Sequence, residues 1–173
     1  MALERKHYIG ILTASVVALA AGTAAQQGFI PHWEGVDHVA IHNKFDPKGV
    51  ITVCNGHTNF DDPNLKEGDY YTNRMCSELL AQDLPKYNAQ LASCLPADLT
   101  VTDHQHVALL SFEYNIGQGN FCKSSVAREL RAGHRAAACH NMTLFVKAAG
   151  VTLKGLVNRR EDKFWGEEAW CLR

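Results

Sequence analysis

The sequence lacks an excess of charge of either sign, and its 173 residues carry a formal net charge of -1. The charge therefore does not steer the chain towards nucleic acid or anionic membranes, and we expect no nucleic-acid partner. Internal repeats and low-complexity tracts are also missing. With 46% hydrophobic residues, the chain can bury the core of one domain of about 140 residues, with an N-terminal appendage.

Charged residues are missing from a long segment near the N-terminus, Tyr8 to Pro31. A bilayer core takes about 20 apolar residues, so this segment is long enough to span it, and the preceding Arg5 and Lys6 would stay cytoplasmic. Alanine, glycine, serine and threonine dominate the segment, which predicts a weak anchor. The small residues Gly22–Ala25 also fit a cleavable signal peptide, so both interpretations stay open.

Cysteine is missing from the N-terminal segment, residues 1–30, and all six cysteines lie in the expected domain, residues 31–173. An exported domain meets an oxidising compartment, which favours disulfides. Six cysteines allow 15 pairings. Local placement favours Cys122 with Cys139, because they flank one short helix, then Cys94 with Cys171 and Cys54 with Cys76.

Metal ligands at a suitable spacing are too few for a metal site. Cys54 and His57 have Cys-x-x-His spacing, but zinc needs two more ligands at tight spacing, and the sequence offers none. We therefore expect no metal and no other cofactor. His57 lies in a Gly-His-Thr turn, where we interpret it as a structural support of the turn rather than a catalytic base.

The stretch from Trp33 to Thr58 combines two carboxylates with a hydroxyl. Asp46 lies in a turn rich in proline and glycine, and Thr52 lies in a β-forming run six residues later. Hydrolysis of a glycosidic bond needs one protonated carboxyl at the leaving oxygen and an ionised one on the other face of the sugar. Glu34 precedes them, and the apolar spacing that follows it predicts one or two helical turns through Val36, Val39 and Ile41.

This stretch resembles the active-site region of the phage-type lysozymes, glycoside hydrolase family 24. The family has a Glu-Gly start, an aspartate, a glycine, a threonine and Gly-His-Thr, which match Glu34-Gly35, Asp46, Gly49, Thr52 and Gly56-His57-Thr58. Ser111–Ser125 resembles the family's Phe-Asn-Gly-Gly segment, and Gly155–Asp162 resembles its Gly-Leu-x-x-Arg-Arg signature. The chain departs in one place, because three extra residues separate the glutamate from the aspartate.

The resemblance implies an α+β, mainly helical fold with a small β-hairpin lobe, a connecting helix, a larger helical lobe and a substrate cleft between the lobes. It implies a muramidase that hydrolyses the β-1,4 bond between N-acetylmuramic acid and N-acetylglucosamine in peptidoglycan, with inversion. Glu34 would be the general acid, and Asp46 and Thr52 would position and activate water.

Three further residues are candidates for binding the substrate. Trp33 adjoins the expected acid. Arg159 and Arg160 would bind the peptide carboxylates of the cell wall, although ordinary helix salt bridges explain them equally well. A rival interpretation is a non-catalytic peptidoglycan-binding or membrane-tethered protein of the same fold, in which the insertion displaces Asp46. A third is a zinc amidase or peptidase.

In the resembled family, a weakly hydrophobic start is often a signal-anchor-release segment, and we favour this over cleavage. Residues 8–30 would first hold the chain in the host inner membrane, facing the periplasm. The released protein would be a soluble periplasmic monomer that lyses the host wall. Because Glu34 follows Pro31 by only three residues, we expect the tethered form to be inactive.

Helix signals dominate the chain after Thr58. Thr72 is the expected N-cap of the connecting helix, which Pro85 would kink or end. Thr102 and Gln105 form a candidate capping box, and another helix starts at Ser124 or Lys123. A third is expected to run to Gly150 as its C-terminal cap.

Overall fold

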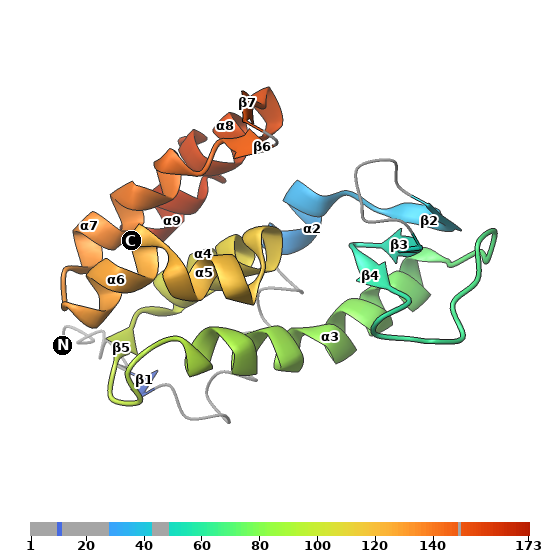
Figure 1. The fold of residues 1–173 in the computed structure, drawn as a ribbon, viewed down its shortest axis with the longest axis horizontal. Helices are drawn as coiled ribbons and strands as arrows, with labels where there is room; N and C mark the ends of the chain where they lie inside the picture. The colour runs from blue at the N-terminus through green and yellow to red at the C-terminus, as the bar shows by residue number, and fades with distance from the viewer. Residues whose placement is uncertain (1–9, 12–27, 43–48, 149) are drawn as a thin grey trace, which may run out of the picture. The chain divides into compact units, whose positions relative to one another are not determined.

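The computed structural model describes residues 10–11, 28–42, 49–148 and 150–173. Asp46 and most of the expected membrane segment lie outside these residues. The chain divides into two compact units (Figure 1): residues 21–86, called the β lobe, and residues 1–20 with 87–173, called the helical lobe. Among the described residues, no helix is both long enough and apolar enough to cross a bilayer.

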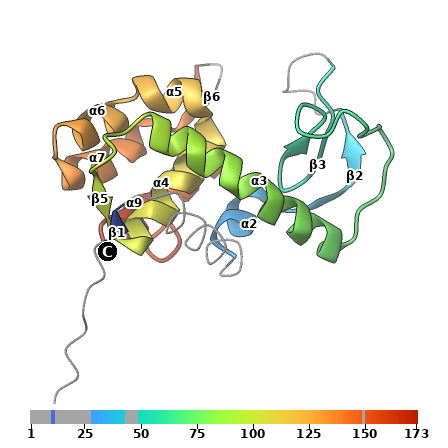
Figure 2. The ribbon, with the colours of Figure 1, turned by 90° about the horizontal axis from the view of Figure 1, so that it is seen from below.

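The β lobe holds a short helix and a three-stranded antiparallel sheet. The helix is α2 (Phe29–Glu34), and the strands are β2 (Asp37–Ile41), β3 (Thr52–Cys54) and β4 (His57–Thr58), in the order β2-β3-β4. Figure 2 shows β2 beside β3. The register pairs Ile41 with Thr52, Thr52 with Thr58 and Val53 with His57.

Strand β2 shows that the expected helical turns after Glu34 are wrong. Helix α2 ends at Glu34 and is followed by Gly35, whose φ of 70° suits glycine. Beyond it, β2 pairs with β3 on one edge, and on the other edge Ala40 N donates to Asp69 O (2.8 Å) and Tyr71 N donates to His38 O (2.8 Å). Over so few residues the apolar spacing does not distinguish a helix from a strand. The hydrogen bonds on both edges therefore decide that this segment is a strand.

One face of this sheet packs on the core of the β lobe. The core consists of Ala40, Val53, Cys54, Leu65 and Cys76, with Ile51, Tyr71 and Leu79 packed against it. A disulfide between Cys54 and Cys76 lies within this core and confirms one of the three expected pairings. It joins β3 covalently to the first turn of the next helix, so the sheet cannot slide along that helix.

That helix is α3 (Asn73–Ser93), the expected connecting helix. Thr72 caps it as predicted, because its Oγ1 accepts a hydrogen bond from Met75 N at 3.3 Å. Pro85 does not end it: the helix continues for two further turns, since a proline removes one backbone donor but leaves the following ones intact. The boundary between the two units falls directly after this proline, between Lys86 and Tyr87.

The helical lobe is built around α4 (Asp103–Ile116), which is buried along most of its length and packs mainly against the last helix. The other elements are β1 (Gly10–Ile11), β5 (Thr100–Val101), α5 (Gln118–Lys123), α6 (Ser125–Arg131), α7 (Arg135–Asn141), a 3₁₀ turn (Met142–Leu144), β6 (Lys147–Ala148), β7 (Val151–Thr152), α8 (Lys154–Glu161) and α9 (Glu167–Cys171). Strand β1 pairs antiparallel with β5.

Two of the expected helix caps are present in this lobe. Thr102 Oγ1 accepts from Gln105 N at 3.1 Å, but the Gln105 amide contacts the Cys171 carbonyl at 3.4 Å, so no reciprocal capping bond from it is seen. Ser124 Oγ accepts from Ala127 N at 3.0 Å. The expected helix up to Gly150 is wrong, since β6 and β7 form a hairpin there and Gly150 has a φ of 80°.

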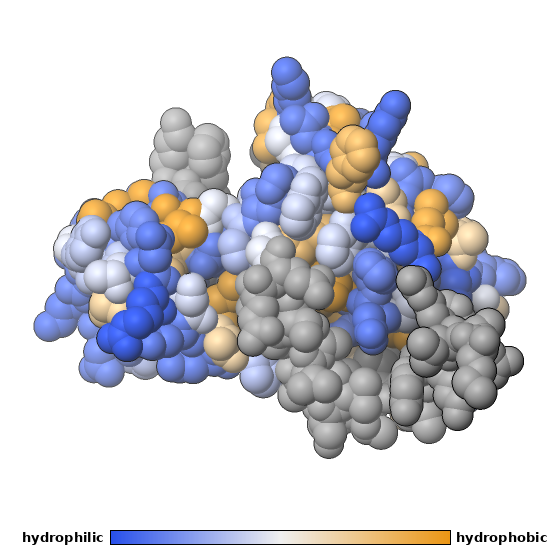
Figure 3. All heavy atoms as spheres, turned by 180° about the vertical axis from the view of Figure 1, so that it is seen from behind, coloured by the Kyte–Doolittle hydropathy of each residue, from blue (hydrophilic) through white to orange (hydrophobic). Residues whose placement is uncertain are grey.

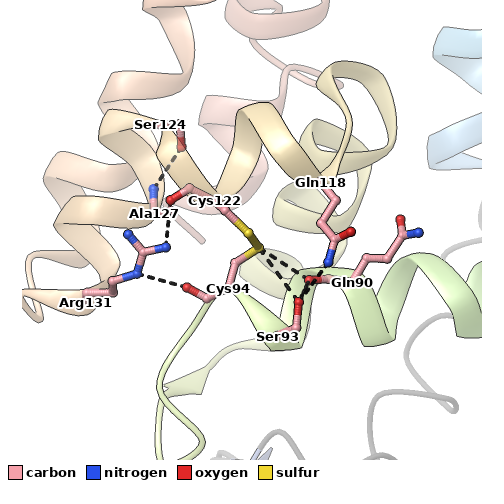
Figure 4. Close-up of a disulfide and its surroundings, with 8 residues drawn as sticks. All are labelled: Gln90, Ser93, Cys94, Gln118, Cys122, Ser124, Ala127 and Arg131. Atoms are coloured by element: carbon pink, nitrogen blue, oxygen red, sulfur yellow. Dashed lines mark hydrogen bonds between the residues drawn. A yellow bond between two sulfur atoms is a disulfide. The ribbon is translucent and has the colours of Figure 1, made fainter.

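Two of the three expected disulfide pairings are also wrong. Cys94, after α3, is bonded to Cys122 in α5, and Cys139 in α7 is bonded to Cys171 in α9. The second bond follows from the packing of α7 against α9, which nothing near Cys139 in the sequence reveals. Figure 4 shows how Arg131 supports the first bond, because it donates to the carbonyls of both bonded cysteines, at 2.9 and 2.7 Å.

His106 makes the stability of the helical lobe depend on pH. Its Nε2 donates to Asn88 Oδ1 at 2.8 Å, and burial lowers its pKa from 6.5 to about 4. The unfolded chain therefore binds a proton between these pH values that the folded chain does not. We expect the free energy of unfolding to fall by up to about 3 kcal/mol as the pH drops from 6.5 to 4.

Urea denaturation of the wild type and of His106→Gln across this range measures the effect. The variant should lose this part of the pH dependence while keeping the contribution of the carboxylates. Parallel curves for the two proteins would show that His106 does not remain neutral in the folded state.

Candidate active site

Glu34 is the last residue of α2, where the β lobe fixes the end of that helix to the sheet. Its side chain is half-buried, and its Oε1 is buried. The carbonyl of the next residue, Gly35, accepts a hydrogen bond from Asn55 Nδ2. Asn55 is buried in the turn between β3 and β4, so this bond holds the candidate acid beside that turn.

Thr52 lies at the start of β3 on the face of the sheet opposite the core. Its neighbours in sequence, Ile51 and Val53, both pack inward. Because side chains alternate along a strand, Thr52 points outward, together with its cross-strand partner Ile41. The turn after β3 is tight, since Cys54 has a φ of 58° and Gly56 a φ of 96°.

His57 forms a buried hydrogen bond in the β lobe, and its structural role stays a prediction. Its Nδ1 donates to Asp83 Oδ2 at 2.8 Å, and both side chains are more than nine-tenths buried. Burial raises the pKa of Asp83, which the hydrogen bond from His57 partly offsets. The Cys-x-x-His spacing does not supply a zinc ligand pair, because Cys54 Sγ is used in a disulfide.

A second contact that holds the sheet in place, at Asp61, was not expected from the sequence. This carboxylate accepts hydrogen bonds from Lys86 and from Thr58 Oγ1, the latter at 2.9 Å. Burial acts to raise the pKa of Asp61, but the two hydrogen bonds together outweigh it, and the pKa is lowered. The bonds hold the end of β4 to α3. No local sequence motif predicts this contact, because Lys86 lies 25 residues from Asp61 in the chain.

Of two further predicted site residues, the structure describes Trp33 but not Asp46. Trp33 is half-buried, and its ring makes an edge-on contact with His32, with centroids 4.7 Å apart. Its role in binding the substrate stays a prediction. Asp46 lies outside the described residues, so its role as the second carboxylate also stays a prediction.

The expectation that Arg159 and Arg160 bind the substrate is wrong for this conformation, because the two side chains are only 4% and 0% exposed. Both form ion pairs with Glu167, which is itself fully buried. Arg159 also donates to Ser111 Oγ at 3.1 Å, and Arg160 donates to Asn115 Oδ1 at 2.5 Å. The salt-bridge alternative is therefore correct, and the two arginines hold α8 and α9 against α4.

A pocket of about 640 Å³ opens in the helical lobe beside Arg160. It lies between the α4–α5 junction and the β6–β7 hairpin, and it is lined by Asn115, Ile116, Asn120, Lys123, Ser124, Ser125, Phe145, Lys147, Ala148, Leu153, Leu156 and Arg160. Lys123 and Lys147 are exposed, and neither forms an ion pair with any residue that the structure describes. The pocket therefore combines an apolar floor with two available ammonium groups.

Comparison with known proteins identifies the family of this chain. The model of the family Phage lysozyme matches residues 31–163. The chain belongs to the phage lysozyme family. It is 34% identical to the SAR-endolysin of Bacteriophage PS119 over 139 residues, which cover 78% of this chain and 80% of that protein.

Solved structures agree with this assignment. The muramidase domain of SpmX from Asticaccaulis excentricus is 25% identical, with a TM-score of 0.73 over 87% of this chain and 95% of that chain. A point mutant of P22 lysozyme is 27% identical, with a TM-score of 0.70 over 87% of this chain and 96% of that chain. The lysozyme is therefore a lytic endolysin and a glycoside hydrolase, and its α+β, mainly helical fold confirms the expected class.

The cluster around Glu167 makes a testable contribution to the stability of the lysozyme. Glu167→Gln removes the one carboxylate that pairs with both buried guanidinium groups, and breaking such a buried pair costs about 3–5 kcal/mol. Glu78→Gln removes the exposed partner of Arg74 and should cost less than about 1 kcal/mol. Urea denaturation of both variants measures the difference, and an equal, small loss for the two would contradict the structural role of Glu167.

Proposed function

We propose that this lysozyme hydrolyses the β-1,4 bond between N-acetylmuramic acid and N-acetylglucosamine in bacterial peptidoglycan. A protonated Glu34 donates to the leaving oxygen, and Asp46 with Thr52 positions and deprotonates a water on the other face of the sugar. The bond to water forms as the glycosidic bond breaks, which inverts the anomeric carbon. This stereochemistry requires the two carboxyl groups to lie about 6.5–9.5 Å apart.

The observation that carries the proposal is the hydrogen bond from Asn55 to the carbonyl next to Glu34. It fixes the end of α2 to the turn that follows β3, the strand of Thr52. A general acid must keep its place relative to the group that holds water, because small misplacements of catalytic groups are costly. The β lobe supplies this rigidity from its own core.

The cationic pocket gives the proposed substrate a second point of attachment. The stem peptides of peptidoglycan carry carboxylates, and Lys123 and Lys147 replace the buried arginines as their candidate partners. The apolar residues of the pocket suit the alanine side chains of such a peptide. We assign no catalytic step to these lysines.

Export and a temporary membrane anchor are also part of the proposal. Residues 8–30 would anchor the chain in the host inner membrane before release, and the released form would act in the periplasm. Pairing of β1 with β5 supports the view that the start of this segment joins the helical lobe after release, and the three disulfides suit an oxidising compartment.

The role of Glu34 can be tested by replacing it. Glu34→Gln should lower the release of reducing sugar ends from purified peptidoglycan by at least about 10²–10⁴-fold, the usual contribution of a general acid. Glu78→Gln, a neutralised glutamate elsewhere in the same lobe, should remain active. Equal lysis of permeabilised Gram-negative cells by the wild type and Glu34→Gln would instead favour the non-catalytic interpretation.

The pocket lysines can be tested with two forms of the same polymer. Lys123→Gln with Lys147→Gln should raise KM several-fold on peptidoglycan that carries stem peptides. On glycan stripped of peptides, KM should equal that of the wild type. Lys163→Gln, an exposed lysine outside the pocket, is the control; an equal rise in KM on both polymers would refute the peptide assignment.

A further inference from the structure

The outward face of the sheet in the β lobe carries more than Thr52. Ala40, between Val39 and Ile41, is fully buried in the core, so its two neighbours point outward. Tyr71 packs on the same core, so Tyr70 points away from it. An isolated antiparallel bridge pairs Val39 with Tyr70, which places these two side chains next to each other on the outward face.

These outward residues are large and apolar, and they are exposed. Val39 is 44% exposed, Ile41 is 43% exposed and Tyr70 is 65% exposed. An outward sheet face normally carries polar residues, so such a cluster indicates a binding surface. Apolar side chains, drawn in orange, are visible at the surface of the β lobe in Figure 3.

The backbone under this apolar face is held firmly. Hydrogen bonds to β2 flank Tyr70 on both sides, from Ala40 N to Asp69 O and from Tyr71 N to His38 O, each at 2.8 Å. The His38 ring lies 6.0 Å from the Tyr70 ring, and His38 Nδ1 contacts the Tyr71 carbonyl at 2.7 Å. The tyrosine side chain is therefore displayed from a rigid base, which lowers the entropic cost of binding.

We propose that Tyr70, with Val39 and Ile41, forms a platform that binds the glycan strand on one side of the bond that is cleaved. The strand register places this platform next to the candidate catalytic residue. Ile41 pairs directly with Thr52, and Val39, two residues earlier in the same strand, pairs with Tyr70. Strand and residue spacings place Tyr70 on the order of 10 Å from Thr52, a distance of one or two sugar rings. The inference rests on the proposed function.

A glycan is the occupant that this surface suits best. Each pyranose ring has a face of C–H groups, which pack on aromatic and aliphatic side chains. Polar groups at the ring edge remain free for the hydroxyl of Tyr70, which bonds no residue that the structure describes. The platform would position the strand without touching the reacting atoms, so it should affect binding more than the chemical step.

The test measures binding and catalysis separately on the full chain. In a Glu34→Gln background, Tyr70→Ala should lower sedimentation with purified, peptide-stripped peptidoglycan glycan at least about fivefold. Tyr70→Phe, which loses only the hydroxyl, should bind within about twofold of the parent. In the active background, Tyr70→Ala should raise KM by a similar factor with kcat within about twofold. Phe164→Ala removes an aromatic ring of the helical lobe that is even more exposed than that of Tyr70, and it should change neither quantity.

Ile41→Thr provides a second variant, which keeps a β-branched side chain in β2 and should weaken binding in the same direction. Undiminished binding of both Tyr70→Ala and Ile41→Thr would overturn the platform. Its failure differs from that of the proposed function: a wild type that releases no reducing ends refutes the muramidase, while the binding comparison still decides whether this face holds glycan.

Discussion

The inward packing of Ala40 and Val53 against the disulfide of Cys54 and Cys76 is the constraint on which the candidate site depends. Side chains alternate along a strand, so burying Val53 forces Thr52 to the opposite face, and a shift by one residue would bury the hydroxyl. The disulfide links this strand to α3, and the His57–Asp83 and Lys86–Asp61 pairs link the next strand to the same helix. A small lobe buries little apolar area, so such links add stability that its core alone does not supply. Each link also helps to fix the register of the strands.

Much of the site could be predicted from the sequence because its residues are close together in the chain. The order of Glu34, Thr52 and the Gly-His-Thr turn needs only local chemistry and a family resemblance, and the structure puts these residues in one lobe. The caps at Thr72 and Ser124 are equally local, since a hydroxyl and a backbone donor three residues later define them. The place of Asp46 is still a prediction.

Apart from the local β6–β7 hairpin, which replaces the expected helix up to Gly150, the errors concern partners far away in the sequence. Burial of Arg160 depends on Glu167, Asn115 and the ring of Phe112, which meet only when α4, α8 and α9 pack together. The disulfide between Cys139 and Cys171 depends on the same packing. The strand at Val39 and Ile41 was mistaken for helical turns because its hydrogen bonds come from β3 and from Asp69–Tyr71. Local patterns contain none of this information.

The most direct test of the account is to map bound glycan onto the sheet by methyl NMR spectroscopy. Purified glycan oligosaccharides would be titrated into the Glu34→Gln protein, and chemical-shift changes of its methyl groups would be followed. The account predicts large changes at Val39, Ile41 and Thr52 and small ones at the inward Ala40 and Val53. Changes confined to other parts of the protein, with the outward residues unaffected, would contradict the claim that this face of the sheet binds the substrate.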